Sequence, residues 1–168
     1  LKSWDVSNVV SMASMFEGCQ SLSDISALSG WKGSNLKNIS NMFWYCASLE
    51  EISALEDWDV SNVEDMHYIF ADCYSLKDIS ALKKWDVSNA RDMGCIFDYC
   101  TSLTDISALK NWDLSSAFNI TAMFRGCESL KNISALKNWD LSKMRENSGL
   151  LSLVANCTSL TDISALKK

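Results

Sequence analysis

Cysteine is the residue whose chemistry and spacing in this chain first suggest a function. Two chemistries are open to a regular row of thiols, disulfide bonds between neighbouring repeats and zinc binding. Zinc sites use cysteine or histidine ligands a few residues apart, whereas this chain has no C-x-x-C pair and His67 as its single histidine. We therefore expect buried, reduced thiols that act as small hydrophobic side chains. The row consists of Cys19, Cys46, Cys73, Cys100, Cys127 and Cys157.

A further cysteine, Cys95, lies outside this row. It stands where other repeats have Ser14 and Tyr68, in a column whose residue type varies, so we expect it to reach solvent. Two interpretations remain open, an incidental surface cysteine and a thiol that reacts or forms a dimer.

Aspartate and serine columns offer two more chemistries. Calcium needs six or more oxygen ligands that converge, whereas the aspartates occur once per repeat and Lys32 interrupts them. We expect these aspartates to cap turns instead. The serines have no histidine base in their pattern, and phosphate-loop, G-x-S-x-G and H-E-x-x-H motifs are absent from the sequence. We predict no catalytic residues, no metal and no cofactor, and therefore a protein that is not an enzyme. The aspartates are Asp5, Asp59, Asp86, Asp113 and Asp140, and the serines are Ser26, Ser53, Ser80, Ser107, Ser134 and Ser164.

These columns are positioned by a sequence repeat of 27 residues, which the tryptophans mark most clearly. A fixed period of this size is typical of a solenoid, in which one unit stacks on the next. We predict a single array of about six repeats over residues 1–168. Both ends fall inside the repeat without a capping unit, which indicates a fragment of a longer repeat protein with open ends on which copies can stack. The repeated tryptophans are Trp4, Trp31, Trp58, Trp85, Trp112 and Trp139.

Two spacings within each repeat predict its elements. Leu76, Ile79 and Leu82 recur at steps of three, which predicts a short strand over 76–82 that pairs in parallel with its copies. Met66 to Cys73 places apolar residues at i, i+3, i+4 and i+7, which predicts a short helix. The predicted class is α/β, with one parallel strand, a turn and a short helix per repeat. An insertion of three residues after Trp139 predicts a bulged loop over 144–149.

Charge and hydropathy exclude several classes of partner. The net charge is −6 and no run of Lys or Arg is present, so nucleic acid and anionic membranes are poor partners. No stretch approaches 18 uninterrupted apolar residues, so we expect no membrane insertion of this segment.

The repeat resembles a known family. The run Trp-Asp-Val-Ser-Asn-Val at 58–63, followed by Met-Phe-x-x-Cys-x-Ser-Leu in other copies, resembles the BspA-like leucine-rich repeats of bacterial surface proteins. The Asp-Ile-Ser-Ala-Leu stretch is similar to the strand of internalin-type repeats. The resemblance covers essentially the whole chain. It implies a right-handed leucine-rich-repeat solenoid, an extracellular or cell-surface location, and adhesion or recognition of a protein ligand or a host or cell-surface component.

Two surfaces are candidates for binding. The variable columns of the predicted helix carry aromatic residues, and tyrosine and tryptophan are common anchors of interfaces. The alternative is that these rings only cover neighbouring side chains. The resemblance also implies binding through the concave strand face, for which a merely solvated surface is the alternative. The aromatic patch is Trp44, Tyr45, His67, Tyr68, Tyr74 and Tyr99, and the strand face is Glu50, Glu51, Lys77, Asp78, Thr104 and Asp105.

The sequence thus favours a non-enzymatic surface module for adhesion or protein recognition. We rank the strand face first and the aromatic patch second. A structural spacer or stalk without its own ligand is the main alternative, and the near identity of the repeats supports it. Carbohydrate binding is a further alternative, because sugars stack on exposed aromatic rings.

Overall fold

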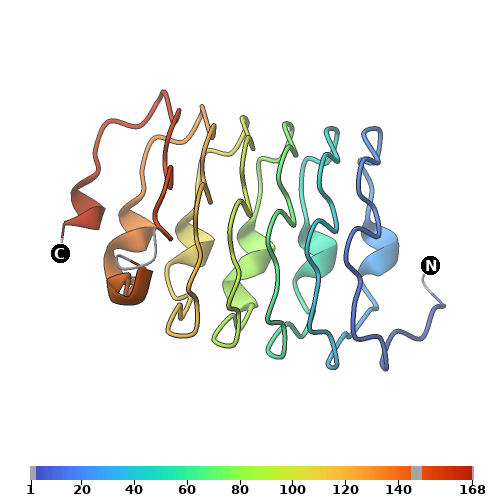
Figure 1. Cartoon of the computed structure of the whole chain (residues 1–168). Helices are drawn as coiled ribbons and strands as arrows, with labels where there is room; N and C mark the ends of the chain where they lie inside the picture. The colour runs from blue at the N-terminus through green and yellow to red at the C-terminus, as the bar shows by residue number, and fades with distance from the viewer. Residues whose placement is uncertain (1–2, 145–148, 168) are drawn as a thin grey trace.

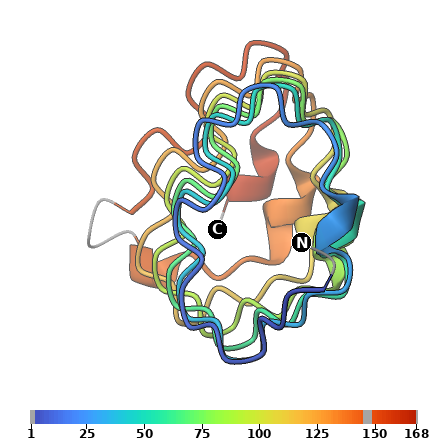
Figure 2. The ribbon, with the colours of Figure 1, turned by 90° about the vertical axis from the view of Figure 1, so that its right-hand side faces the viewer.

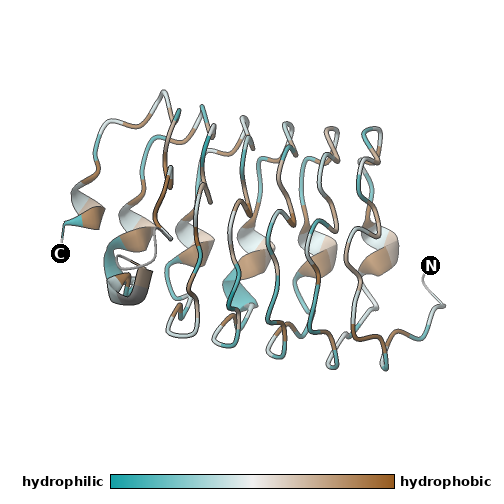
Figure 3. Ribbon diagram, viewed as in Figure 1, coloured by the Kyte–Doolittle hydropathy of each residue, from teal (hydrophilic) through white to brown (hydrophobic). Residues whose placement is uncertain are grey.

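The chain is a stack of backbone coils, each of which corresponds to one sequence repeat (Figure 1). The computed structural model describes residues 3–144 and 149–167. Seen along the stack, successive coils follow almost the same path (Figure 2). Residues that share a place in the repeat therefore lie next to each other in neighbouring coils. Hydrophobic residues recur at the same places in each coil (Figure 3).

Hydrogen bonds between coils run along the segment that begins at Met66. Every second backbone N–H group donates to a carbonyl oxygen of the next coil at 2.7–3.0 Å: Met66 to Asp92, Tyr68 to Gly94, Phe70 to Ile96, and Asp72 to Asp98. The groups between them close turns within the coil, because the N–H of Cys73 donates to the oxygen of Phe70. Tyr68 and Asp72 take the left-handed conformation, with φ of 56° and 57°.

The helix predicted over 66–73 is therefore wrong, because consecutive turns occupy this segment. A run of turns that each close over three residues repeats its apolar positions every three or four residues, as an α-helix does. The difference lies in the N–H groups, which bond the next coil instead of the carbonyl four residues earlier. Hydrophobic spacing alone does not distinguish the two arrangements.

The segment predicted as a strand also differs. Ser80–Lys84 forms a 3-10 helix, η3, and in the strand segment only Asp78 makes a parallel bridge, to Glu51. A 3-10 helix has three residues per turn, so side chains three apart point the same way. This explains how Ile79 and Leu82 both reach the core. The in-phase copies are η1 (Ser26–Leu28), η2 (Ser53–Leu55), η4 (Ser107–Leu109), η5 (Ser134–Asn138) and η7 (Ser164–Leu166).

Within residues 3–144 and 149–167 the remaining sheet structure consists of isolated bridges. Four of them join one place in successive coils: Ser11 to Asn38, Asn38 to Asp65, Asp65 to Asp92, and Asp92 to Asn119. An additional 3-10 helix, η6 (Ser142–Met144), begins the inserted region, and the rest of the predicted bulge lies largely outside the described residues. The assignment of the stack as an α/β leucine-rich-repeat solenoid stays a prediction.

The aspartates predicted to cap turns do so. The backbone N–H two residues later donates to the side-chain oxygen of Asp5, Asp59, Asp86, Asp113 and Asp140 at 2.8–3.1 Å. In addition, the Nδ2 atoms of Asn62 and Asn89 donate to backbone oxygens of the preceding coil. These side chains take the place of proline, which the sequence lacks, in shaping the turns.

Aromatic rings stack from coil to coil along the core. Phenylalanine centroids are 5.4–5.9 Å apart in the series Phe16, Phe43, Phe70, Phe97 and Phe124. Tryptophans form a second row, in which the Nε1 atoms of Trp58, Trp85, Trp112 and Trp139 donate to leucine carbonyls of the preceding coil at 3.0–3.2 Å. Trp31 is buried as well, whereas Trp4, at the end of the stack, is 56% exposed.

The cysteine row is bonded in the same way. Each thiol donates to the backbone oxygen of a phenylalanine in the preceding coil at 3.0–3.2 Å, in Cys46, Cys73, Cys100, Cys127 and Cys157. All seven cysteines are free thiols, and Cys19 is the exposed one. Burial raises the pKa of Cys46 to about 12 and that of Cys100 well above its ordinary value. These groups are therefore held as neutral thiols.

Cys95 corrects an expectation from the sequence. It is 7% exposed rather than open to solvent. Its Sγ atom lies 3.6 Å from the Thr121 oxygen, and the hydroxyl of Tyr68 donates to it from the preceding coil. A small side chain in this column is covered by the large one beside it in the stack.

No helix within residues 3–144 and 149–167 has the length and apolar character to cross a membrane.

We expect the substitution Phe97→Ala to lower the free energy of unfolding by about 3–5 kcal/mol, because it leaves a cavity in the stacked row. The matched control is Phe118→Ala, since Phe118 is 52% exposed and its loss costs about 0.5 kcal/mol or less. Urea denaturation of both variants measures the difference. Equal costs would contradict the role of the stacked phenylalanines.

We also expect one thiol of the 168-residue chain to react quickly with a chromogenic thiol reagent at neutral pH, and that thiol is Cys19. The other thiols should react only as the chain unfolds. Cys19→Ser should remove the fast phase, whereas Cys95→Ser should leave it intact. A fast phase that depends on Cys95 would show that its cover by Tyr68 is wrong.

Candidate functional site

The aromatic residues predicted as a patch lie on the turn segments of neighbouring coils, where most of them contact one another. The Trp44 and Tyr68 rings are 5.8 Å apart, and the His67 ring lies edge-on to Tyr68 at 5.7 Å. Tyr45 and Tyr74 form an edge-to-face pair at 5.9 Å. Tyr99 makes a different contact, with Arg125.

Exposure divides the patch into supporting and accessible rings. Trp44, His67 and Tyr68 are half-buried. Tyr45, Tyr74 and Tyr99 are 37–38% exposed, which is high for large aromatic side chains. The patch is thus partly packed against its neighbours and partly open to a ligand.

A depression of about 310 Å³ lies among the accessible rings. Three successive coils contribute to it, and Gly18, Tyr45 and Asp72 occupy the same left-handed position in these coils, with φ of 71°, 59° and 57°. The residues around it are Glu17, Gly18, Trp44, Tyr45, Asp72 and Tyr74. We define these six residues as the aromatic depression. From the sequence, Asp72 is expected among the displayed rings, whereas Glu17 and Gly18 share the repeat columns of Trp44 and Tyr45 but are not part of the predicted patch.

Asp72 holds the Trp44 ring in place and lies close to Tyr74. Its Oδ2 atom accepts a hydrogen bond from Nε1 of Trp44 at 2.8 Å, and its charge acts on the hydroxyl of Tyr74. Burial, followed by the negative charge of Asp72, raises the pKa of Tyr74 to about 12. The carboxylate therefore orients Trp44 before any ligand arrives, while Tyr74 packs edge-to-face against Tyr45.

Tyr68 and His67 support the patch from the side. The hydrogen bond from the Tyr68 hydroxyl to Cys95 and then burial raise the pKa of Tyr68 to about 12. The Nδ1 atom of His67 lies 2.6 Å from Oδ1 of Asp65. Both polar groups are thus engaged within the chain.

Tyr99 makes a cation–π contact with Arg125 of the same chain. The guanidinium of Arg125 lies 5.5 Å from the centre of the Tyr99 ring. The Nε atom of Arg125 donates a hydrogen bond to Oδ1 of Asp98 at 2.8 Å, and its Nη2 atom donates one to Oδ2. Asp98 is only 3% exposed. This ion pair raises the pKa of Arg125.

The residues predicted as a concave strand face lie instead beside the 3-10 helices, and all of them are exposed. The carboxylates of Glu51, Asp78 and Asp105 each accept a hydrogen bond, at 2.7–2.8 Å, from the backbone N–H of the serine two residues later. Lys77 pairs with Glu50 at 3.1 Å. Thr104 lines the second of two hollows that lie between successive 3-10 helices, of about 450 and 540 Å³.

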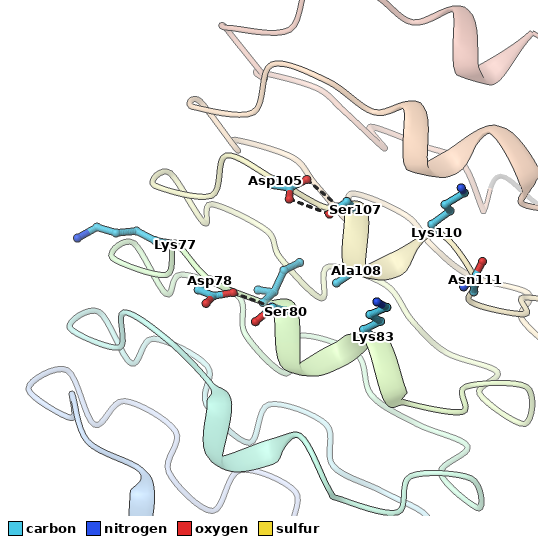
Figure 4. Close-up of a pocket in the computed structure, with 10 residues that line it drawn as sticks. Lys77, Asp78, Ser80, Lys83, Asp105, Ser107, Ala108, Lys110 and Asn111 are labelled. Carbon is cyan, nitrogen blue, oxygen red and sulfur yellow. Dashed lines mark hydrogen bonds between the residues drawn. The ribbon is translucent and has the colours of Figure 1, made fainter.

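Lysines outside the prediction line these hollows together with residues of the predicted face. Lys83 and Lys110 line the first one together with the predicted residues Lys77, Asp78 and Asp105 (Figure 4). Sequence reasoning missed Lys83 and Lys110, although they follow the repeated Ser-Ala-Leu at the same place. Among residues 3–144 and 149–167, no group of three or more His, Cys, Asp or Glu side chains converges as metal ligands would.

One family model matches the chain. It is described as "Mycoplasma protein of unknown function, DUF285", and it matches residues 1–78 and again residues 47–162. Two overlapping matches of one model are consistent with the internal repetition. No curated protein matches the chain.

We expect the tyrosine environment to make stability depend on alkaline pH. Because the folded-state pKa of Tyr68 is raised to about 12, its contribution is present below pH about 10 and is lost as pH rises through about 12. The free energy of unfolding should therefore fall over this range, and less steeply in Tyr68→Phe. Urea denaturation at several pH values measures this. Equal pH dependence in the two proteins would contradict the buried hydrogen bond to Cys95.

Proposed function

The chain belongs to the DUF285 family of Mycoplasma proteins of unknown function, and we propose that it is a non-enzymatic module that recognises a protein ligand or a host or cell-surface component. We propose further that its repeats are BspA-like leucine-rich repeats in a right-handed solenoid. The repeated Trp-Asp-Val-Ser-Asn-Val and Met-Phe-x-x-Cys runs support this assignment. An extracellular or cell-surface location is part of the same proposal.

The aromatic depression is the observation that carries the proposal. Tyr45 and Tyr74 stand open at its rim, and Trp44 forms a wall that Asp72 fixes. Rings that are already ordered lose little side-chain entropy when a partner binds. Tyrosine and tryptophan are also the side chains that most often dominate binding energy. A purely structural spacer does not require rings held open in this way.

The surface over the 3-10 helices is the second candidate. Its two hollows, which Lys83 and Lys110 help to line, can receive side chains of a partner. Its carboxylates, however, are already used as caps within the chain. We therefore rank this surface below the aromatic depression, which reverses the order that the sequence favoured.

Binding of the fluorescent chain to cultured animal cells, followed by flow cytometry, tests the proposal. The double variant Tyr45→Ser/Tyr74→Ser should lower the apparent affinity by about tenfold or more, because each exposed aromatic anchor contributes about 1–2 kcal/mol. The matched control is Lys83→Ser/Lys110→Ser, which changes two exposed residues of the other surface. Circular dichroism should show both variants folded.

The other outcomes discriminate between the alternatives. Loss of binding in the lysine variant alone would move the site to the surface over the 3-10 helices. Absence of binding by the unmodified chain would favour a spacer. Competition by free sugars, with the tyrosines still required, would favour carbohydrate recognition.

A further inference from the structure

We infer that the aromatic depression takes an arginine side chain of a protein partner. This inference rests on the proposed function and names the chemical group that the depression would receive. It is carried by the charges around the depression and by a guanidinium that this chain itself holds between a tyrosine ring and a carboxylate.

The charges around the depression favour a cation. Glu17 and Asp72 are the two ionisable acids among the six residues that line it, and none of the six is basic. The faces of aromatic rings carry partial negative charge, so Trp44 and the two tyrosines attract a cation in addition. The net charge of −6 acts in the same direction over longer distances.

The chain contains its own example of the interaction. Tyr99 occupies the same repeat position as Tyr45, two coils later. The Arg125 guanidinium lies over the Tyr99 ring while Asp98 binds its nitrogens. Ala71 stands where Arg125 would be expected relative to Tyr45, so the chain supplies no guanidinium at the earlier position. Trp44 takes the place of Asp98 before Tyr45, so the carboxylate of the depression comes from the next coil, as Asp72. Tyr45 and Asp72 line the same depression, where a partner's arginine can contact both.

The geometry favours guanidinium over ammonium. A guanidinium is planar, so it can lie on a ring while its edge donates hydrogen bonds to a carboxylate. Asp72 uses part of its hydrogen-bonding capacity on Trp44, but its two oxygens together can accept about four hydrogen bonds. The perpendicular arrangement of Tyr45 and Tyr74, at 82°, gives such a plane two walls of different orientation.

Three peptide probes test the inference: N-acetyl-Gly-Arg-Gly-amide, the same peptide with citrulline, and the same peptide with lysine. Citrulline keeps the shape of arginine but removes its charge. The readout is the Trp44 indole N–H signal in nitrogen–proton NMR, assigned with Trp44→Phe. We expect a saturable shift with arginine at millimolar concentrations, and binding about fivefold weaker with citrulline.

Two variants of equal charge change locate the site. Asp72→Asn should weaken arginine binding by about fivefold. Asparagine suits the left-handed backbone there, since Asn156 occupies the same repeat position with φ of 61°. The matched control, Asp105→Asn, should leave binding unchanged, because Asn132 already makes the equivalent turn cap in the next coil.

The inference is overturned if the citrulline or lysine peptide binds as tightly as the arginine peptide. It is also overturned if the Trp44 signal does not shift in a saturable way, or if Asp72→Asn has no effect. These failures differ from failure of the proposed function. Should Tyr45→Ser/Tyr74→Ser still abolish binding to cells, the depression remains a recognition site for a different chemical group.

Discussion

The hydrogen bonds between coils are the constraint on which the rest of this structure depends. The N–H of Met66 meets the oxygen of Asp92, 26 residues later, and the same offset recurs along the turn segment. This register brings like residues together, so the rows of phenylalanine, tryptophan and cysteine follow from it. After the insertion the offset grows, since Ile120 bonds Gly149. The ladder continues beyond the insertion, where Ala122 bonds Leu151 and Phe124 bonds Leu153.

The same constraint decides where variation is tolerated. Alternate residues of the turn segment must bond the next coil, and the chain achieves this with two left-handed residues per coil, such as Tyr68 and Asp72. Non-glycine residues in this conformation cost about 1 kcal/mol or more, which neighbouring contacts must offset. Glycine would adopt it more easily, yet Tyr45 and Tyr99 are found there. The side chains of Tyr45 and Tyr99 are exposed, so a ligand can reach them.

The sequence predicts the parts of this structure that depend on period alone. The stacking rows and the aspartate caps follow from the 27-residue repeat, and so do the columns of the aromatic patch. The elements do not follow, because consecutive turns and an α-helix share one spacing, while a 3-10 helix and a coiled strand share another. The burial of Cys95 and the hydrogen bond that Asp72 accepts depend on which residue of the adjacent coil lies next to each of them. That offset is a property of the ladder, and the repeat length does not contain it.

The two candidate surfaces differ in how much order they have before binding. Lys83 and Lys110 are long, exposed side chains, and fixing each of them costs up to about 2 kcal/mol of rotamer entropy. Trp44 is already held by Asp72, and Tyr45 and Tyr74 pack against each other. A contact of equal strength therefore contributes more to affinity at the aromatic depression. For this reason the depression is the better candidate, although the surface over the 3-10 helices offers larger hollows.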